Sequence, residues 1–312
     1  MRITILGPGA IGCLLAGLLA RAGEKVTLLD YRPERAAEIS QRGVSIKSAD
    51  NEFAVPVRAT ADPAEIIPPE LLLVCVKAFR TEAAAKPLAS CVGDETAVLT
   101  LQNGLGNVEQ LSAVFGKARV LGGVTGHGAI LQGAGQVLHT GVGETVIGEQ
   151  SGQVTARLEQ IKSSFDRANI STTVTADLAG AVWGKVVVNC AINPLAALTR
   201  LRNGDLLGEP SLADLLEKVA AEAAQIATAN GVQLPYPDPG ERMRQVCRQT
   251  AGNINSMLAD VLSRRPTEIN QINGAVARAA AAAGVPAPLN QALTALVSAV
   301  EKNYTIRVET EK

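Results

Sequence analysis

The stretch VWGKVVVNCAINP, residues 182–194, carries three polar residues in an otherwise apolar run: Lys185, Asn189 and Asn193. Neighbouring members are four residues apart, so in an α-helix each is turned by only about 40° from the last. One ammonium group and two amides would then share a face. An ammonium group can stabilise negative charge that develops on a carbonyl oxygen, and amides suit hydroxyl and carboxylate groups. The alignment favours a functional site over three separate structural roles, such as a snorkelling lysine and capping asparagines.

A glycine-rich loop, GPGAIG, follows the strand-like run RITILG and opens an apolar stretch. A dinucleotide-binding loop requires this context. Gly7 would make the tight turn, Gly9 would let the backbone approach a pyrophosphate, and Gly12 would let the helix pack on the strand. The helix N-terminus offers unpaired N–H groups and partial positive charge to the phosphates. The loop predicts a set of cofactor contacts: Gly7, Pro8, Gly9, Ala10, Ile11 and Gly12.

The residues after the second predicted strand bear on the choice of cofactor. In LLDYRPER, Asp30 could accept a hydrogen bond from the 2′-hydroxyl of NADH, whereas Arg32 or Arg35 could bind the 2′-phosphate of NADPH. A carboxylate facing the phosphate would repel it, unless the side chain of Asp30 turns away. These residues alone leave both cofactors open.

A further candidate segment, RRPTEI, covers residues 264–269. Pro266 and Thr267 can start a helix with Glu268 in its first turn. A carboxylate there interacts favourably with the helix dipole, so Glu268 has a structural interpretation beside a functional one.

These candidates need a scaffold, and the first half of the chain predicts an α/β one. Segments 44–59 and 119–149 are rich in β-formers and glycine turns, and they predict hairpins and an antiparallel addition to the sheet. A helix near 153–168 and the strand ISTTVT close this half. The remaining elements alternate, with buried parallel strands at 2–7, 25–30, 71–79 and 96–104 and helices near 10–22, 33–42 and 80–91.

The strand pattern disappears from about residue 177, and turn segments such as GVQLPYPDPG separate apolar stretches. We predict an α/β Rossmann-type domain over 1–173 and an all-α domain over 174–312, packed together with a cleft between them. The predicted helices cover 177–199, 211–230, 239–263, 267–283 and 288–303.

Composition limits the class of protein. The 312 residues are 47% hydrophobic, 19% charged and only 3% aromatic, with a net charge of −1, which argues against disorder and against a nucleic-acid partner. The start of the chain does not resemble a signal peptide. No uncharged stretch approaches the ~20 residues of a membrane span, so we expect a soluble, cytoplasmic protein. Five scattered cysteines and two histidines, His127 and His139, predict neither a disulfide framework nor a metal site.

The order of motifs resembles the ketopantoate reductase family (2-dehydropantoate 2-reductases) over nearly the whole chain. The matching pieces are GPGAIG, VCVKAF with Lys77, LQNGLGN with Asn103, GHGA with His127 and Ala129, WGKVVVNCAINP, Asn203, NSMLAD with Ser256, and RRPTEINQINGAV with Glu268. The resemblance implies a Rossmann-type domain followed by a helical domain like the C-terminal one of 6-phosphogluconate dehydrogenase. It also implies NADPH-dependent reduction of 2-dehydropantoate to (R)-pantoate, in the synthesis of pantothenate and coenzyme A.

Roles for single residues follow from the same resemblance. The resemblance implies that Lys185 is the catalytic acid and that Glu268 is a catalytic residue that also contacts the cofactor. The implied substrate contacts are Asn103, Asn189, Asn193, Asn203 and Ser256. The predicted cofactor contacts outside the glycine loop are Tyr31, Arg32, Lys77, Asn103, Ala129 and Glu268. Similar reductases commonly have a basic residue at the adenosine end, so NADPH is expected, while Asp30 leaves NADH open.

Elementary chemistry agrees with a lysine acid. Hydride addition to a ketone develops negative charge on oxygen, which Lys185 would stabilise before it donates a proton. Burial among Val186, Val187 and Trp183 should lower its pKa, whereas Glu268 nearby should raise it and keep the lysine protonated. The substrate carboxylate also calls for a cation, and the candidates are Lys77, Arg202, Arg264 and Arg265.

Other interpretations predict other residues. A reductase of another small 2-oxo acid fits the same motifs. A hydroxy acid or opine-type dehydrogenase would not need the RPTEI segment, and a non-catalytic NAD(P)H sensor would not need the lysine and its aligned amides. The sequence leaves the oligomeric state open and favours a homodimer through the helical half.

Overall fold

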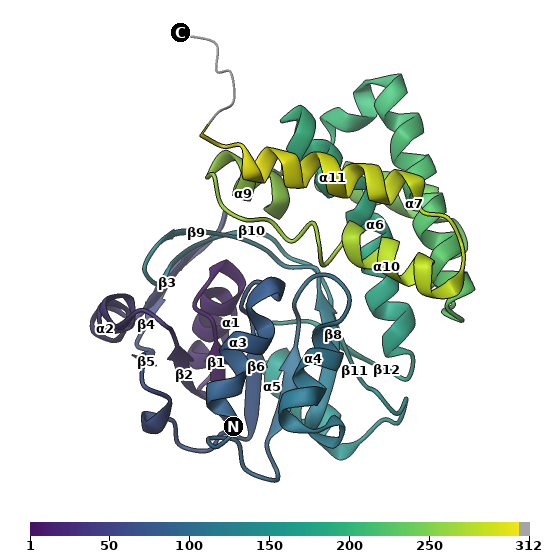
Figure 1. The fold of residues 1–312 in the computed structure, drawn as a ribbon. Coiled ribbons are helices and arrows are strands. Elements are labelled where there is room, and N and C mark those ends of the chain that lie inside the picture. Colours follow the sequence, from purple (N-terminus) through teal and green to yellow (C-terminus); the bar gives the residue numbers. More distant parts are fainter. Residues whose placement is uncertain (306–312) are drawn as a thin grey trace, which may run out of the picture. The chain divides into compact units, whose positions relative to one another are not determined.

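The computed structural model describes residues 1–305 and divides into two compact units. One unit comprises residues 1–102 and 106–178, and the other comprises 103–105 and the chain from Ala179 onwards. The predicted division after residue 173 falls inside the last strand of the first unit, β12 (Thr172–Thr175). The described strands all lie in the first unit, and the described part of the second unit is helical (Figure 1).

An eight-stranded sheet forms the centre of the first unit, in the order β12-β11-β8-β7-β6-β1-β2-β5. All neighbouring strands are parallel except the pair β11 and β8, which is antiparallel. The order reverses between β1 and β6, and a ligand of such a sheet binds at the carboxyl ends of the strands beside this reversal. The strands are β1 (Arg2–Leu6), β2 (Lys25–Leu29), β5 (Arg58–Thr60), β6 (Leu71–Val74), β7 (Ala97–Thr100), β8 (Val120–Thr125) and β11 (Thr145–Glu149), with β12.

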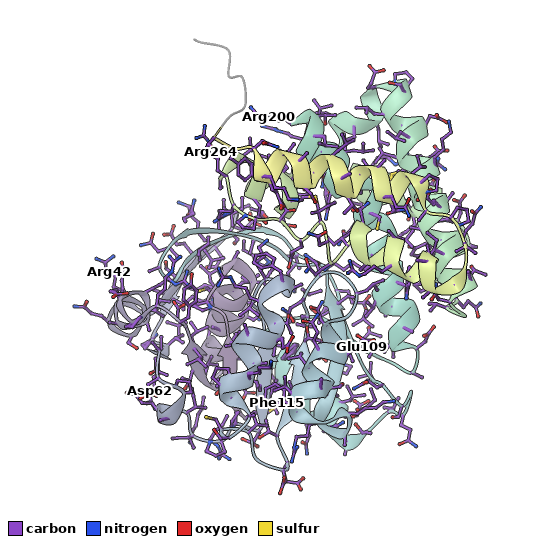
Figure 2. The ribbon with its side chains drawn as sticks, in the orientation of Figure 1. Arg42, Asp62, Glu109, Phe115, Arg200 and Arg264 are labelled. Atoms are coloured by element: carbon purple, nitrogen blue, oxygen red, sulfur yellow. The ribbon has the colours of Figure 1, made fainter. Side chains whose placement is uncertain are left out.

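Helices cover both faces of this sheet. One core includes Leu15 of α1 and Phe165 of α5, and a second core on other strand residues includes Leu111 and Phe115 of α4; Phe115 is labelled in Figure 2. The helices are α1 (Ala10–Arg21), α2 (Pro33–Arg42), α3 (Thr81–Ala85), α4 (Asn107–Phe115) and α5 (Ala156–Arg167), with short 3-10 turns at Pro63–Glu65, Ala78–Arg80, Lys86–Leu88 and Lys117–Arg119.

The two predicted hairpins form a sheet of their own, and this corrects the expectation that they add to the main sheet. The hairpins are β3 (Val44–Lys47) with β4 (Glu52–Val55), and β9 (Gly128–Gly133) with β10 (Gln136–Gly141). Val137 of β10 pairs with Ile46 of β3, so the hairpins join in the order β4-β3-β10-β9. This sheet buries Val44, Ile46 and Val137 against α1, which offers Gly17 at the contact. The antiparallel addition to the main sheet is β11.

Two predicted strands are shorter than expected. The strand expected over 71–79 ends at Val74, and the one expected over 96–104 ends at Thr100. Leu6, Val74 and Thr100 are register partners in neighbouring strands, so all three strands end together and no ladder continues beyond them. The loops that follow are therefore grouped at one edge of the sheet.

The described part of the second unit contains α6 (Leu178–Thr199), α7 (Pro210–Ala229), α8 (Pro239–Gln249), α9 (Ser256–Leu262), α10 (Asn273–Ala283) and α11 (Pro288–Lys302), with a 3-10 turn at Asp205–Gly208. The helix expected over 239–263 is two helices, because Asn255 caps a new one by accepting from the Leu258 N–H at 3.0 Å. The helix expected from residue 267 begins only at Asn273, since Ile272 has a non-helical φ/ψ of −102°/−93°.

Helix α6 is the centre of the helical core. It is long and apolar enough to meet the length and composition test for a membrane span, although 72% of its most apolar window is buried inside the protein. A core helix of a soluble protein has these same properties.

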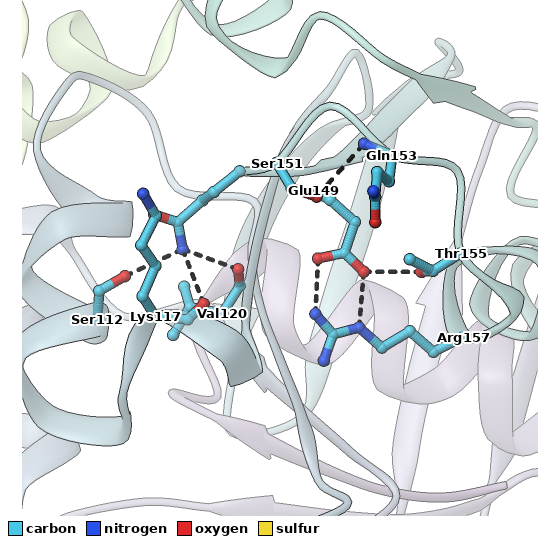
Figure 3. A network of polar contacts seen from close by, with 9 residues as sticks. Ser112, Lys117, Val120, Glu149, Ser151, Gln153, Thr155 and Arg157 are labelled. Carbon is cyan, nitrogen blue, oxygen red and sulfur yellow. Dashed lines mark hydrogen bonds and ion pairs between the residues drawn. The ribbon is translucent and has the colours of Figure 1, made fainter.

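The edge of the large sheet where β11 ends carries a polar network (Figure 3). Glu149 accepts from Arg157 at 2.6 Å from each of two nitrogens and from Thr155 Oγ1 at 2.7 Å. Gln150 Nε2 donates to Ser112 Oγ at 3.1 Å. These bonds anchor the turn between β11 and α5, at the amino end of β8 and so opposite the edge where the glycine loop lies.

Candidate functional site

The glycine loop lies at the carboxyl end of β1. Gly7 has a φ of +101°, and a Cβ there would lie 2.7 Å from Val76 Cγ1, while a Cβ on Gly12 would strike the Gly7 carbonyl oxygen. Gly9 is the N-cap residue of α1 and has no atom within 4 Å of the place a Cβ would take. The backbone is thus held tightly on one side and open at the helix N-terminus, an arrangement that fits a pyrophosphate.

The carboxylate of Asp30, at the end of β2, is turned inwards and neutralised. It is 3% exposed and accepts from two nitrogens of Arg35, with Nη2 at 2.7 Å from Oδ1. The Arg32 N–H adds a third bond at 3.2 Å. The hydrogen bond with Asp30 also raises the pKa of Arg35. Both carboxylate oxygens are therefore engaged by the protein.

Two guanidinium groups lie instead around the exposed ring of Tyr31. The Arg32 Cζ is 5.1 Å from the ring centroid and its Nε donates to the Tyr31 hydroxyl at 2.8 Å. The Arg80 Cζ, from the turn after β6, is 5.5 Å from the same centroid. The sequence analysis did not predict that Arg80 contacts Tyr31, because the two residues lie about fifty positions apart. Only the strand order, in which β2, β1 and β6 are neighbours, brings the loops that carry them together.

The loops after β6 and β7 carry the predicted residues Lys77 and Asn103, both partly buried. Gln102, which the sequence did not single out, ties these loops together by donating to Val76 O at 2.7 Å and Thr81 Oγ1 at 2.8 Å. Beyond it, the Leu105 N–H donates to Gln271 O at 2.9 Å, so the segment with Asn103 packs with the second unit.

Ala129 lies at the start of β9, opposite His139 of β10 in the strand register. His127 is 7% exposed, and its Nδ1 lies 3.0 Å from His139 Nε2. Burial and the neighbouring His139 lower the pKa of His127 to about 4. The two rings are therefore a neutral, hydrogen-bonded pair at ordinary pH, and they fix the segment next to Ala129.

Lys185, Asn189 and Asn193 all lie on α6, as the spacing predicts. Lys185 and Asn189 are partly buried and Asn193 is 5% exposed. Burial lowers the pKa of Lys185 from 10.5 to about 8, against the charge of Glu268, which raises it. Both effects expected from the sequence are present, and the lysine remains largely protonated at neutral pH.

Helix α6 continues through Pro194, which has no N–H to donate to the Cys190 carbonyl. Asn273 supplies the missing donor, with Nδ2 at 2.9 Å from Cys190 O and 3.0 Å from Asn290 Oδ1. Asn290 in turn donates to Glu222 Oε1 at 2.8 Å. This buried network, absent from the sequence-based prediction, holds α6 to α7, α10 and α11 at the level of its aligned amides.

Glu268 lies in a turn before α10 and not in the first turn of a helix, which corrects the prediction. Thr267 Oγ1 accepts from the Ile269 N–H at 3.1 Å, and the Glu268 carbonyl accepts from Gln271 and Ile272 at 3.0 Å each. The side chain is 7% exposed. The turn places it where its charge acts on Lys185.

The last two predicted substrate contacts differ in exposure. Ser256, the first residue of α9, is exposed, while Asn203 is 6% exposed and makes side-chain hydrogen bonds with Thr250 and Asn255. Among the proposed carboxylate partners, Arg265 forms an ion pair with Asp260 at 3.3 Å.

The first unit therefore gathers the glycine loop, the Tyr31 cluster and the loops after β6 and β7 at one sheet edge. The second unit brings Lys185 and Glu268 together and places Asn203 beside the start of α9. One group of residues suits a dinucleotide, and the other suits proton donation to a polar small molecule.

Comparison with known proteins identifies the family. Family models described as ketopantoate reductase PanE/ApbA and its C-terminal part match residues 3–152 and 177–301. The 2-dehydropantoate 2-reductase of Pyrococcus horikoshii is 38% identical, over 96% of this chain and 98% of its own. A crystal structure of a PanE/ApbA family ketopantoate reductase from Ralstonia eutropha is 31% identical, with a TM-score of 0.89 over 97% of this chain and 99% of its own.

A D-mandelate dehydrogenase solved with NADH and anilino(oxo)acetate has a TM-score of 0.92, over 98% of this chain and all of its own, at 23% identity. That likeness shows the shared fold alone. The two family models together span both units, and the predicted order of a Rossmann-type domain and a helical domain is confirmed. This chain belongs to the ketopantoate reductase PanE/ApbA family.

Proposed function

We propose that this chain is a soluble, cytoplasmic enzyme that reduces 2-dehydropantoate to (R)-pantoate, with NADPH as cofactor and Lys185 as general acid. The observation that carries the proposal is a partly buried lysine, with a pKa of about 8 beside buried Glu268, on a helix face with two amides. The names of the relatives support the substrate.

The cofactor, when bound, supplies the hydride. As hydride reaches the ketone carbon, the Lys185 ammonium stabilises the negative charge growing on the carbonyl oxygen and then transfers a proton to it. Glu268 keeps the lysine charged at neutral pH despite its burial. We assign the hydroxyl and carboxylate of the substrate to the predicted contacts, because amides and hydroxyls bind both with little desolvation cost. These contacts are Asn103, Asn189, Asn193, Asn203 and Ser256.

Preference for NADPH is supported by the Tyr31 cluster. Arg35 neutralises Asp30, which removes both the repulsion of a 2′-phosphate and the acceptor that a 2′-hydroxyl would use. Arg32 and Arg80 place two guanidinium groups at an exposed ring, and guanidinium binds phosphate strongly. We therefore assign the 2′-phosphate to Arg32 and Arg80, and the rest of the cofactor to the glycine loop, Lys77, Asn103, Ala129 and Glu268.

The direct test measures oxidation of NADPH and of NADH by the purified chain with a panel of 2-oxo acids that includes 2-dehydropantoate. We expect the highest kcat/KM with 2-dehydropantoate and NADPH, and loss of turnover in Lys185→Ala. If another 2-oxo acid gives the highest kcat/KM, that acid replaces 2-dehydropantoate as the proposed substrate. Absence of turnover with every acid in the panel would refute the proposed reaction.

The cofactor assignment has its own test. Arg80→Gln should raise the KM for NADPH about tenfold and leave that for NADH unchanged, since one phosphate contact is lost. Arg42→Gln is the matched control, because Arg42 is an exposed arginine at the far end of α2, paired with Glu38 (Figure 2). Equal effects of Arg80→Gln on both cofactors would contradict the assignment.

A further inference from the structure

Four side-chain hydrogen bonds connect the end of α8 with the start of α9 through Asn203. Thr250 Oγ1 donates to Val246 O at 2.7 Å, and Asn203 Nδ2 donates to Thr250 Oγ1 at 2.9 Å. Asn255 Nδ2 donates to Asn203 Oδ1 at 3.0 Å, and Asn255 Oδ1 accepts from the Leu258 N–H at 3.0 Å. The chain thus runs from one backbone group to another.

The polarity of the chain is determined by its two ends. A backbone N–H can only donate, so Asn255 must present Oδ1 to Leu258 and Nδ2 to Asn203. Asn203 must then present Oδ1 to Asn255 and Nδ2 to Thr250. The Thr250 hydroxyl accepts this bond and gives its proton to the Val246 carbonyl, which can only accept. Neither amide can flip without breaking two bonds.

Backbone contacts hold the same segments together. The Asn203 N–H donates to Asn253 O at 3.2 Å and the Gly204 N–H donates to Ala251 O at 3.1 Å. A Cβ on Gly204 would lie 2.5 Å from the Ala251 Cβ, so only glycine permits this approach. The 203–204 segment is therefore fitted against the loop that leads into α9.

Asn203 and Ser256 differ in solvent exposure. Asn203 is 6% exposed and both polar atoms of its amide are already engaged, whereas Ser256, directly after Asn255, is exposed. We propose that Thr250, Asn203 and Asn255 form a relay that sets the orientation of Ser256 for the 2-oxo acid, so that Asn203 acts as a positioning residue for Ser256 in addition to its own proposed substrate contact. The inference rests on the proposed function.

The test is a double-mutant cycle between Thr250→Val, which removes the relay's hydroxyl at nearly constant volume, and Ser256→Ala. Thr250→Val should raise the KM for the 2-oxo acid ~3- to 10-fold, as expected for one lost hydrogen bond, with the KM for the cofactor unchanged. In the Ser256→Ala background it should change nothing further. Additive effects in the cycle would overturn the proposal.

Two variants control for folding. Thr228→Val removes the same kind of bond, from a hydroxyl to the carbonyl four residues earlier, at 3.1 Å in α7, and should leave both KM values unchanged. Thr250→Ser keeps the hydroxyl and should behave as the wild type. If Thr250→Val does not fold, Asn255→Asp replaces it, because aspartate retains the cap on Leu258 but loses the donor to Asn203.

Hydrogen exchange at the Leu258 amide gives an activity-independent readout. Thr250→Val should accelerate it and Thr228→Val should not. If the wild type reduces no 2-oxo acid, the proposed function is refuted, and exchange at Leu258 still decides whether the relay orders the start of α9. Unchanged exchange in Thr250→Val would refute the relay itself.

Discussion

The pH dependence of turnover should report the protonation state of Lys185. The acid must carry its proton to reduce a ketone, so kcat/KM should be constant while the lysine is charged and fall as the pH rises through its pKa. Burial lowers that pKa from 10.5 to about 8 even with the opposing charge of Glu268. A lysine with an ordinary pKa would leave the profile flat across this range.

The magnitude follows from the titration. With a pKa of about 8, roughly 90% of Lys185 is protonated near pH 7 and roughly 10% near pH 9, so kcat/KM should fall about tenfold between them. Glu268→Gln removes the charge that raises the pKa and should move the fall to lower pH. Lys185→Arg keeps a charge at every accessible pH and should give a lower but flat profile.

Initial rates of NADPH oxidation in buffers of constant ionic strength measure all three profiles. Lys185→Ala should lose about 10²- to 10⁴-fold in kcat/KM, the usual contribution of a general acid. A flat wild-type profile, or the same alkaline fall in Lys185→Arg, would show that another group titrates and would refute the assignment of the acid.

Three further predictions concern other parts of the molecule. Asn193→Ala should raise the KM for the 2-oxo acid and lower kcat/KM about 10- to 100-fold, and unchanged steady-state kinetics would give Asn193 a purely structural role. Gly104→Ala should destabilise the protein by ~2–4 kcal/mol, since φ is +90° and a Cβ would meet the Gln271 carbonyl; Gly116→Ala, with φ of +83° and nothing nearer than 3.9 Å, should cost about 1 kcal/mol, and equal melting temperatures would contradict the close contact. The pKa of His127 is lowered to about 4 in the folded protein, so its full contribution to the free energy of unfolding is present above its unfolded pKa of about 6.5. That contribution decreases by up to ~3 kcal/mol as the pH falls to 4, and urea unfolding should show a smaller loss of stability at acid pH in His127→Asn than in the wild type.

Local sequence patterns were enough for the elements that depend on neighbours along the chain. The glycine loop between a strand and a helix, and the four-residue spacing of Lys185, Asn189 and Asn193, predict structure through backbone sterics and helix periodicity. Both lie where the patterns indicate. The start of α10 differs from the prediction. Hydrogen bonds to Thr267 and Glu268 form a turn, and Ile272 has a non-helical φ/ψ, so the helix begins only at Asn273.

Tertiary structure alone decided which distant groups meet. Strand order brings Arg80 to Tyr31, the Asp30 carboxylate is neutralised by Arg35, and Asn273 satisfies the carbonyl that Pro194 leaves without a donor. The sequence shows that such charges and amides exist, but their partners depend on sheet order and helix packing. A buried polar group must find a partner wherever the fold supplies one, and sequence separation carries no information about that choice.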